Sequence, residues 1–257
     1  MNILFLGDIV GKSGRQAVIS SLPSLKKKYD IDFTVVNAEN AAHGKGITGK
    51  IYNSLKAAGV DVITLGNHAF SKSEIIEKMN DCVDMIRPAN MEPLQYGHSC
   101  IVKKCGNMTV GVINLMGSIF MNSVTEPPVS CMRQLYKTVH ADVILVDLHA
   151  EATSEKQMFF QYFRNEVTAV IGTHTHVQTA DEMIKDGCAF MCDAGMCGSY
   201  DSILGRDIDE VIHHNILNEA TKFIPAEGPA IICGCVITID DSTHRAVSIE
   251  RIQMRPE

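Results

Sequence analysis

Short apolar runs recur along the first part of the chain, and each one ends in polar or small residues. The runs at residues 3–6, 33–36 and 62–65 have the length of β-strands. The first two are each followed by apolar residues at helical spacing, through Leu22 in one segment and Leu55 in the next. Strands that alternate with helices in this way predict β-α units and a largely parallel sheet.

The rest of the pattern predicts further strands and one more clear helix. A hairpin is expected at residues 99–103 and 108–114, with its turn near Gly106-Asn107. Residues 117–128 show little periodicity, and we expect a loop there that serves as a lid over a site. The other expected elements are strands at residues 143–146, 167–171, 189–191, 230–239 and 245–252, the last two antiparallel, and a helix at 154–163.

No repeat, low-complexity tract or linker divides the chain, and 257 residues lie within the range of one α/β domain. We therefore predict a single domain over residues 1–257. Hydrophobic residues make up 46% and charged residues 21%, as in ordinary globular proteins. The net charge is -7 and no basic run exceeds Lys26-Lys27-Lys28, which argues against a surface that coats nucleic acid. A small phosphate-bearing substrate drawn to metal ions is compatible with this charge.

The cysteines favour a reducing compartment. There are nine of them, an odd number, and residues 1–6 read directly into a strand rather than into a signal peptide, so we predict a cytoplasmic protein. Cys188, Cys192, Cys197, Cys233 and Cys235 lack Cys-x-x-Cys spacing and are expected to be buried small hydrophobes rather than metal ligands. The longest apolar stretches fall far short of the ~20 residues of a membrane span, so no membrane contact is predicted.

Side chains that bind metals stand just beyond the carboxyl ends of the apolar strands. Ligand groups in α/β sheets gather at that edge, so we expect these side chains to meet. Each one alone has an ordinary explanation as a helix cap, a turn residue or a solvated group. Together, with no lysine or arginine among them, they predict a metal site. The residues concerned are Asp8, Glu39, Asn40, Asn67, His68, His149, His174 and His176.

The segment Gly172-Thr173-His174-Thr175-His176 leaves two arrangements open. If the backbone is extended, His174 and His176 point the same way, because strand side chains alternate, and both would bind one ion. If the backbone turns sharply, they diverge enough to serve two neighbouring ions. We expect Gly172 to make such a turn sterically favourable.

The types of candidate ligand indicate which metal ions the site would bind. Carboxylate and amide oxygens with neutral imidazoles and no thiolate suit iron, manganese or zinc rather than calcium. The seven candidates other than His68 exceed what one ion uses. Two ions that share a bridging carboxylate would use them, and two ions ~3.5–4 Å apart form the usual clamp for in-line attack on phosphorus.

The order and composition of these motifs resemble the calcineurin-like metallophosphoesterases. Longer runs are similar to the YmdB-type bacterial branch of that superfamily, and the matching blocks extend from residue 3 to the Asp193-Ala194-Gly195-Met196 turn. The superfamily motifs are Gly7-Asp8, Gly66-Asn67-His68, His149 and Gly172-Thr173-His174-Thr175-His176. The branch-specific runs are residues 7–11 (GDIVG), 37–46 (NAENAAHGKG), 147–156 (DLHAEATSEK) and 172–181 (GTHTHVQTAD).

The resemblance implies a four-layer α-β-β-α sandwich with mixed sheets and a dinuclear metal centre that hydrolyses cyclic nucleotides or related phosphodiesters. His68 would lie beside the ions without binding them and donate a proton to the leaving oxygen. Glu39 would bridge the ions, which splits His174 and His176 between them. Carried over by position, one ion would be held by Asp8, Glu39, Asn40 and His176, and the other by Glu39, Asn67, His149 and His174.

The sequence departs from the superfamily pattern at four places. Val10 stands where an Asp-x-His motif would supply an imidazole, and the resemblance implies that Asn40 replaces it. Glu39 is one methylene longer than the usual bridging aspartate. Ala69 and Phe70-Ser71 stand where an orienting acid and a Trp-Asp pair are common, so the group that orients His68 is left unassigned.

We therefore expect a hydroxide between two ions, iron or manganese ahead of zinc, to attack a phosphodiester in line. A phosphomonoesterase or a nuclease acting on RNA would use the same centre, although a monoesterase would suit extra basic groups and only Lys12 and Lys45 offer themselves. A regulatory protein that binds nucleotides and turns them over slowly is the alternative from another class. Met116, Ile119, Phe120 and Met121 suit a lid, the core or the interface of a homo-oligomer. We expect substrate choice to lie in loops 44–48 and 117–128.

Overall fold

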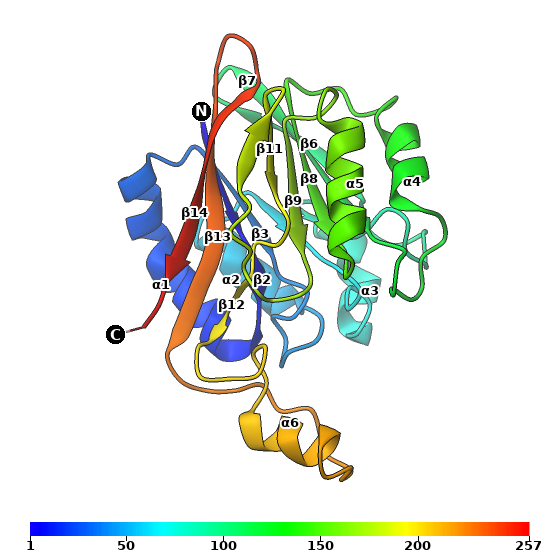
Figure 1. Cartoon of the computed structure of the whole chain (residues 1–257), viewed down its shortest axis with the longest axis vertical. Helices are drawn as coiled ribbons and strands as arrows, with labels where there is room; N and C mark the ends of the chain where they lie inside the picture. The colour runs from blue at the N-terminus through cyan, green and yellow to red at the C-terminus, as the bar shows by residue number, and fades with distance from the viewer. Residues whose placement is uncertain (257) are drawn as a thin grey trace.

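The computed structural model describes residues 1–256, whose strands form two facing sheets (Figure 1). The larger sheet has eight strands in the order β2-β12-β13-β1-β3-β4-β5, with β14 paired to β13. Its strands are β1 (Asn2–Leu6), β2 (Asp8–Ile9), β3 (Phe33–Asn37), β4 (Val62–Thr64), β5 (Met85–Ile86), β12 (Met196–Ser199), β13 (Ala230–Ile239) and β14 (Ala246–Met254). The smaller sheet has six strands in the order β10-β11-β9-β8-β7-β6. They are β6 (Cys100–Cys105), β7 (Met108–Met116), β8 (Val143–His149), β9 (Ala169–Thr173), β10 (Met183–Lys185) and β11 (Cys188–Met191).

Helices cover the outer faces of both sheets. The larger sheet carries α1, α2 and α3, and the smaller sheet carries α4 and α5, whereas α6 stands apart at the bottom of the view (Figure 1). No helix within residues 1–256 has both the length and the apolar composition needed to cross a bilayer. The helices are α1 (Gly11–Tyr29), α2 (Gly49–Ala57), α3 (Ser73–Lys78), α4 (Pro128–Leu135), α5 (Thr153–Phe163) and α6 (Ile208–Asn215), with a short 3-10 helix at Met79–Asp81.

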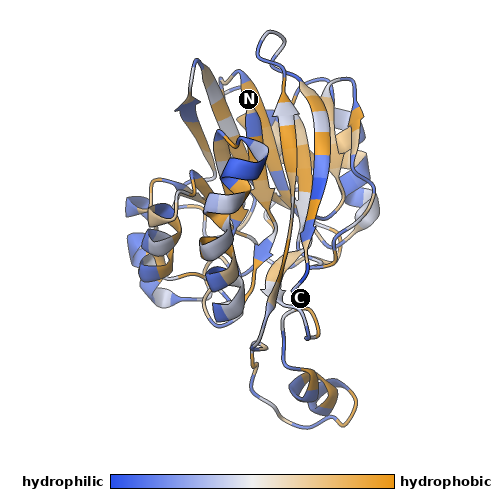
Figure 2. Ribbon diagram, turned by 90° about the vertical axis from the view of Figure 1, so that its left-hand side faces the viewer, coloured by the Kyte–Doolittle hydropathy of each residue, from blue (hydrophilic) through white to orange (hydrophobic). Residues whose placement is uncertain are grey.

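Three apolar cores account for the layered arrangement. The central core lies between the sheets, where Phe5 and Phe33 of the larger sheet meet Val110 and Leu145 of the smaller one. The two outer cores join each sheet to its helices. Figure 2 accordingly shows apolar colour concentrated on the strands and more polar colour on the outer helices. The predicted four-layer α-β-β-α sandwich is confirmed.

Most predicted elements are present, and one pairing makes the larger sheet mixed. Strands β1, β3, β4 and β5 are parallel neighbours, as expected from the β-α units. However, β13 returns from the end of the chain to pair antiparallel with β1, and β14 pairs antiparallel with β13. The hairpin of β6 and β7 is antiparallel and turns at Gly106, also as predicted.

Residues 200–229 form an excursion between β12 and β13 that the sequence pattern did not predict. It contains α6, which has only eight residues and begins at the N-cap Asp207, whose side chain accepts a hydrogen bond from the Glu210 amide. Val211 and Glu210 are the buried residues of α6, so its apolar stripe is too short to register as an amphipathic pattern.

The loop at residues 117–128 is fastened to the helical side of the smaller sheet. The buried carboxylate of Glu155 on α5 accepts hydrogen bonds from the amides of Ser118 (2.9 Å) and Ile119 (3.2 Å). Met116 is fully buried and Met121 packs against the outer core, whereas Ile119 and Phe120 are exposed by 40% and 86%. Of the four residues considered for a lid, the core or an oligomer interface, Met116 and Met121 therefore belong to the core.

The contact between α1 and β12 requires a glycine. A Cβ atom at Gly14 would lie 2.0 Å from the carbonyl oxygen of Cys197, so the helix approaches the strand by backbone contact. We expect Gly14→Ala to lower the free energy of unfolding by about 1–3 kcal/mol. Helix propensity alone would raise it by about 1 kcal/mol, so the sign of the change reports the contact. Denaturant unfolding measures it, with the exposed Gln16→Ala on the same helix as control; a more stable Gly14→Ala protein would contradict the close approach.

Candidate metal centre

The eight predicted site residues come to one edge of the sandwich from both sheets. Asp8 belongs to β2, and the segments after β3 and β4 carry Glu39-Asn40 and Asn67-His68. From the smaller sheet, His149 ends β8, and His174 and His176 follow β9. The carboxyl ends of the parallel strands therefore meet at this edge, as the positions of the polar residues predicted.

Glu39 lies at the middle of the cluster and is 1% exposed. It forms one group with His149 and His174 and a second group with Asp8 and His176, and the ligand atoms of each group lie within 4.8 Å of one another. The two groups share Glu39. Both consist of carboxylates and imidazoles, while the nine cysteines are all free thiols, most of them buried.

Each group has an asparagine beside it. Asn67 Oδ1 lies 3.0 Å from His149 Nε2, at the first group. Asn40 Nδ2 lies 3.1 Å from His176 Nε2 and donates to Glu39 Oε1 at 2.8 Å, at the second group. All seven predicted ligands are thus in contact with one or the other group.

The backbone turns sharply at the two histidines. His174 has φ 106° and His176 has φ 66°, both in the left-handed region that residues with side chains rarely adopt. Their rings diverge, because His174 Nδ1 lies 3.1 Å from His149 Nε2 whereas His176 Nε2 faces Asn40. The expectation that Gly172 forms this turn is wrong. Gly172 lies within β9, where a Cβ would meet the carbonyl oxygen of Cys192 at 1.8 Å, so it allows β9 to pack closely against the segment that follows β11.

A buried ion pair holds the turn in place. Asp193 Oδ2 accepts from the amide of Thr175, between the two histidines, at 3.0 Å and from Lys156 Nζ at 2.8 Å. Lys156 and Asp193 are 0% and 1% exposed. Removing one partner of such a pair strongly destabilises the folded protein, because the other charge stays buried without a partner. Lys156 was missed in the sequence, although a lysine on the apolar face of the expected helix was a signal.

His149 is oriented from behind by a hydrogen-bonded relay. Thr173 Oγ1 accepts from His149 Nδ1 (2.9 Å) and donates to Asp147 Oδ1 (2.7 Å). Asp147 Oδ2 accepts further bonds from Asn37 Nδ2 and Thr64 Oγ1. With Nδ1 carrying the proton of that bond, Nε2 faces the centre, which is the arrangement found behind metal-binding histidines.

The other two histidines are also held at their outward nitrogens. His176 Nδ1 donates to the carbonyl oxygen of Leu204 at 2.9 Å, and His174 Nε2 lies 3.0 Å from Glu151 Oε2. Leu204 belongs to the excursion, where Leu204 and Gly205 have φ 54° and 87° and are flanked by the paired residues Ile203 and Arg206. This is the geometry of a tight two-residue hairpin turn.

The ionisation of these groups reflects crowded charge. Burial raises the pKa of Asp8 to about 6, against the opposing charges of His176 and His149. Burial would also raise the pKa of Glu39, but contacts with His149 and His68 hold it well below its usual range. Burial acts to lower the pKa of His149, yet Glu39 outweighs it and raises that pKa to about 9.

Two further observations fit a cation. Burial, with the charge of His149, lowers the pKa of His174 to about 4, which leaves its ring neutral and its lone pair available. Asp8 Oδ1 is buried and has no hydrogen-bond partner among residues 1–256. An unpaired buried carboxylate oxygen is costly unless a charged partner satisfies it. The residues present therefore fit divalent metal ions.

His68 stands beside this cluster. Its amide donates to Glu39 Oε2 at 3.1 Å, and its Nδ1 lies 2.8 Å from Asn40 Oδ1 and 3.6 Å from Glu39 Oε1. Its side chain is 29% exposed and faces the pocket described next. Asn40 is thus the residue whose side chain contacts the His68 ring at hydrogen-bond distance, whereas Ala69 is fully buried in the outer core.

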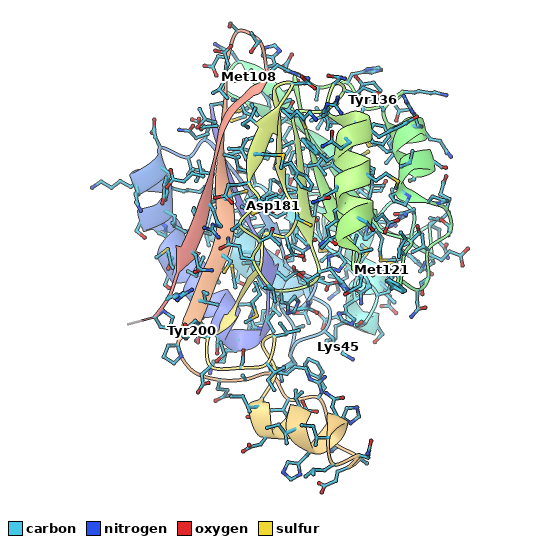
Figure 3. All side chains as sticks on the ribbon, in the orientation of Figure 1. Lys45, Met108, Met121, Tyr136, Asp181 and Tyr200 are labelled. Atoms are coloured by element: carbon cyan, nitrogen blue, oxygen red, sulfur yellow. The ribbon has the colours of Figure 1, made fainter. Side chains whose placement is uncertain are left out.

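A pocket of about 330 Å³ opens beside the centre. Of the two loops expected to choose the substrate, loop 44–48 contributes Gly44, whereas residues 117–128 are absent from the lining, so the prediction of a lid there is wrong for this pocket. Figure 3 shows Lys45 where the body of the molecule meets the excursion, with Met121 on the side below α5. The lining consists of Val10, Glu39, Asn40, Gly44, His68, Glu151, His174, Thr175, His176, Leu204, Arg206 and Phe223.

Solved structures share this architecture over almost the whole chain. The crystal structure of a phosphatase from Mycoplasma pneumoniae matches with a TM-score of 0.93 and 35% identity, covering 99% of this chain and 93% of that one. A protein of Thermus thermophilus, described as hypothetical, matches with a TM-score of 0.93 and 32% identity over 100% of both chains. The fold is an α/β sandwich of the metallophosphoesterase type.

Sequence comparison narrows the class. The family model of YmdB-like proteins matches residues 4–252. A Bacillus subtilis (strain 168) relative, named 2',3'-cyclic-nucleotide 2'-phosphodiesterase, is 44% identical over 254 residues, which is 98% of this chain and 96% of that protein. The chain belongs to the YmdB-like protein family, as its motifs predicted. It is a phosphoester hydrolase.

The relay behind His149 generates a prediction. Thr173→Val removes the hydroxyl that joins His149 to Asp147, and loss of such an outer partner typically weakens metal binding 10–100-fold. We expect a loss of about that size in Mn²⁺ affinity, measured by calorimetric titration of metal-free protein.

Thr34→Val is the matched control, because Thr34 is a fully buried strand residue whose hydroxyl has no partner among residues 1–256. It should leave Mn²⁺ affinity unchanged. Parent-like affinity in Thr173→Val would show that the relay does not orient a ligand.

Proposed function

We propose that the chain is a dinuclear metal-dependent phosphodiesterase that acts on cyclic nucleotides or related small phosphodiesters. The observation that carries the proposal is the sharing of Glu39 between two groups of ligand-type atoms, each completed by imidazole and amide groups. A carboxylate with two oxygens is suited to bridging two cations, and two cations are the usual requirement for in-line displacement at phosphorus.

The contacts support two ligand sets. One ion would be held by Asp8, Glu39, Asn40 and His176, and the other by Glu39, Asn67, His149 and His174. Nitrogen and oxygen donors without thiolate suit iron or manganese, with zinc as a further candidate. When bound, the ions would supply an activated water and neutralise charge on the phosphoryl oxygens.

The protein's own contribution to proton transfer would come from His68. An amide has nearly the same shape in both orientations, so Asn40 is able to present either its oxygen or its nitrogen to the centre. With the oxygen toward the centre, Asn40 Nδ2 donates to His68 Nδ1, and the imidazole proton stays on Nε2. His68 Nε2 is then the group that donates a proton to the leaving oxygen, a role suited to an imidazole near neutral pH.

The substrate class is supported by the relative from Bacillus subtilis, whose name is that of a cyclic-nucleotide phosphodiesterase. A phosphomonoesterase would favour unpaired positive charge for the extra phosphate charge. Lys12 lines a different pocket, and Arg206 is already paired with the carboxylate of Glu210 at 2.7 Å. The proposal also places the protein in the cytoplasm, which the free thiols favour. Residues 1–257 are proposed to form one domain.

A substrate panel tests the proposal. The purified protein is stripped of metal, reloaded with Mn²⁺, Fe²⁺ or Zn²⁺, and assayed with 2',3'-cyclic AMP, p-nitrophenyl phosphate and a short single-stranded RNA. We expect activity only after reloading, with kcat/KM for the cyclic diester at least about tenfold above the other two.

The alternatives give different results in the same panel. Faster hydrolysis of p-nitrophenyl phosphate would indicate a phosphomonoesterase, and preference for RNA a nuclease. Turnover below about one per minute on every diester, with tight nucleotide binding, would indicate a regulatory protein instead.

Two substitutions separate proton transfer from metal binding. His68→Ala should retain both metals and lose about 10²–10⁴-fold in kcat, the usual contribution of a general acid. Glu39→Ala should lose metal content as well as rate, because it removes the shared carboxylate. Metal analysis and steady-state kinetics measure both effects.

The exposed His140→Ala, remote from the centre, serves as the control and should match the parent. Equal turnover in His68→Ala and parent would remove His68 from the mechanism. A Glu39→Ala protein that still binds two ions would show that Glu39 is not the bridge.

A further inference from the structure

The pocket has two unlike sides. One side carries the polar residues of the metal centre, and the other carries Val10, Leu204, Arg206 and Phe223. Three of these four come from the excursion at residues 200–229, and none has a part in the contacts that hold the centre through a side chain. The second side is therefore available to the part of a substrate that does not react.

The planar guanidinium group of Arg206, called here the Arg206 plate, is held in one position. Its Nε donates to Glu210 Oε2 (3.1 Å) and its Nη2 to Glu210 Oε1 (2.7 Å) and Oε2 (2.9 Å). Glu210 is buried on α6 and also accepts from Thr221 Oγ1, so its carboxylate is held by both residues. No residue in the described part of the chain accepts from Arg206 Nη1. The uncovered part of the guanidinium therefore has donors to offer.

Phe223 covers one face of this plate. The Arg206 guanidinium carbon lies 4.8 Å from the centre of the Phe223 ring, and Lys45 Nζ lies 5.1 Å from the same centre. The ring also lies against the backbone of Gly44, where a Cβ would meet Phe223 Cε1 at 2.2 Å. The loop after β3 thus positions the Phe223 ring, and that ring positions the guanidinium group of Arg206.

The chemistry of this wall favours a flat, uncharged ring. Glu210 offsets the charge of Arg206, so a second anion gains little there, whereas a guanidinium plane stacks well on aromatic rings and bases. Val10 and Leu204 add apolar surface. A volume of about 330 Å³ lies at the lower end of small-molecule sites, which span about 300–1,000 Å³.

We propose that this wall is a nucleobase subsite, in which the base of a nucleotide substrate stacks on the Arg206 plate beside Val10 and Leu204. The inference rests on the proposed function, because it assigns the non-reacting part of the same substrate. The excursion is then the element that distinguishes a nucleotide from other cyclic phosphodiesters.

The test compares two substrates with the same reacting ring. One is 2',3'-cyclic AMP, and the other is methyl ribofuranoside 2,3-cyclic phosphate, which keeps the ribose and replaces the base with a methoxy group. The ratio of their kcat/KM values isolates the base. In Arg206→Lys, which keeps a charge for Glu210, and in Phe223→Leu, we expect this ratio to fall about tenfold or more, mainly through KM for the nucleotide.

Lys222→Gln is the matched control, since Lys222 is an exposed cation of the same excursion and is absent from the pocket lining. It should leave the ratio unchanged. Metal content is measured for each variant. A parent-like ratio in both Arg206→Lys and Phe223→Leu, or an equal loss on both substrates, would overturn the subsite.

A binding measurement keeps the two proposals distinguishable. Adenosine 3'-monophosphate and ribose 5-phosphate are titrated into the metal-loaded parent and variants. The subsite requires tighter binding of the nucleotide by the parent and loss of that preference in Arg206→Lys. A parent that hydrolyses neither diester yet shows this preference refutes the proposed activity and supports the subsite. A parent that hydrolyses both substrates without preference in rate or binding refutes the subsite alone.

Discussion

The contact between Glu39 and His149 is the constraint on which the rest of the centre depends. Glu39 follows a strand of the larger sheet and His149 ends a strand of the smaller sheet, yet their side chains lie 3.3 Å apart and are almost fully buried. Buried charged groups are destabilising unless they are paired and hydrogen-bonded. The two sheets must therefore meet in one register at this edge, and the relay through Thr173 to Asp147 and the ion pair of Lys156 with Asp193 fix the surrounding strands in that register.

Sequence reasoning identified the centre because the relevant signal is positional. A polar residue directly after an apolar run marks the end of a strand and also places its side chain at the edge of the sheet, so Asp8, Glu39 and His149 could be identified from the sequence alone.

The excursion could not be predicted from the sequence, for a physical reason. Residues 200–229 bury little, and their one helix is too short to show a period. Their contact with His176 is made by the backbone carbonyl of Leu204, which no side-chain pattern encodes. The turn at His174 was one of two alternatives, but it was assigned to Gly172, because residues with side chains seldom adopt its backbone angles.

The departures from the superfamily pattern have structural compensation. Val10 belongs to a small apolar cluster, and Gly205 of the excursion comes so close that a Cβ there would lie 2.5 Å from Val10 Cγ1. A larger polar ring at position 10 would compete with that turn for space. Ala69 is buried in the outer core, where an unpaired acid would be destabilising, and the side-chain amide of Asn40 contacts His68 Nδ1 instead. In this chain one asparagine thus contacts both the ligand cluster and His68.

The turn at Leu204 and Gly205 has a consequence for how enzymes of this type are able to diversify. Its carbonyl oxygen holds a histidine of the reacting centre, while the side chains around it face the pocket. Every amino acid carries the same carbonyl, so replacing a side chain in the excursion leaves that hydrogen bond chemically unchanged as long as the turn is kept. Substitutions in this segment would then change the pocket lining while the contact with His176 is kept. The excursion thus separates the pocket lining, which its side chains determine, from the support of His176, which its backbone provides.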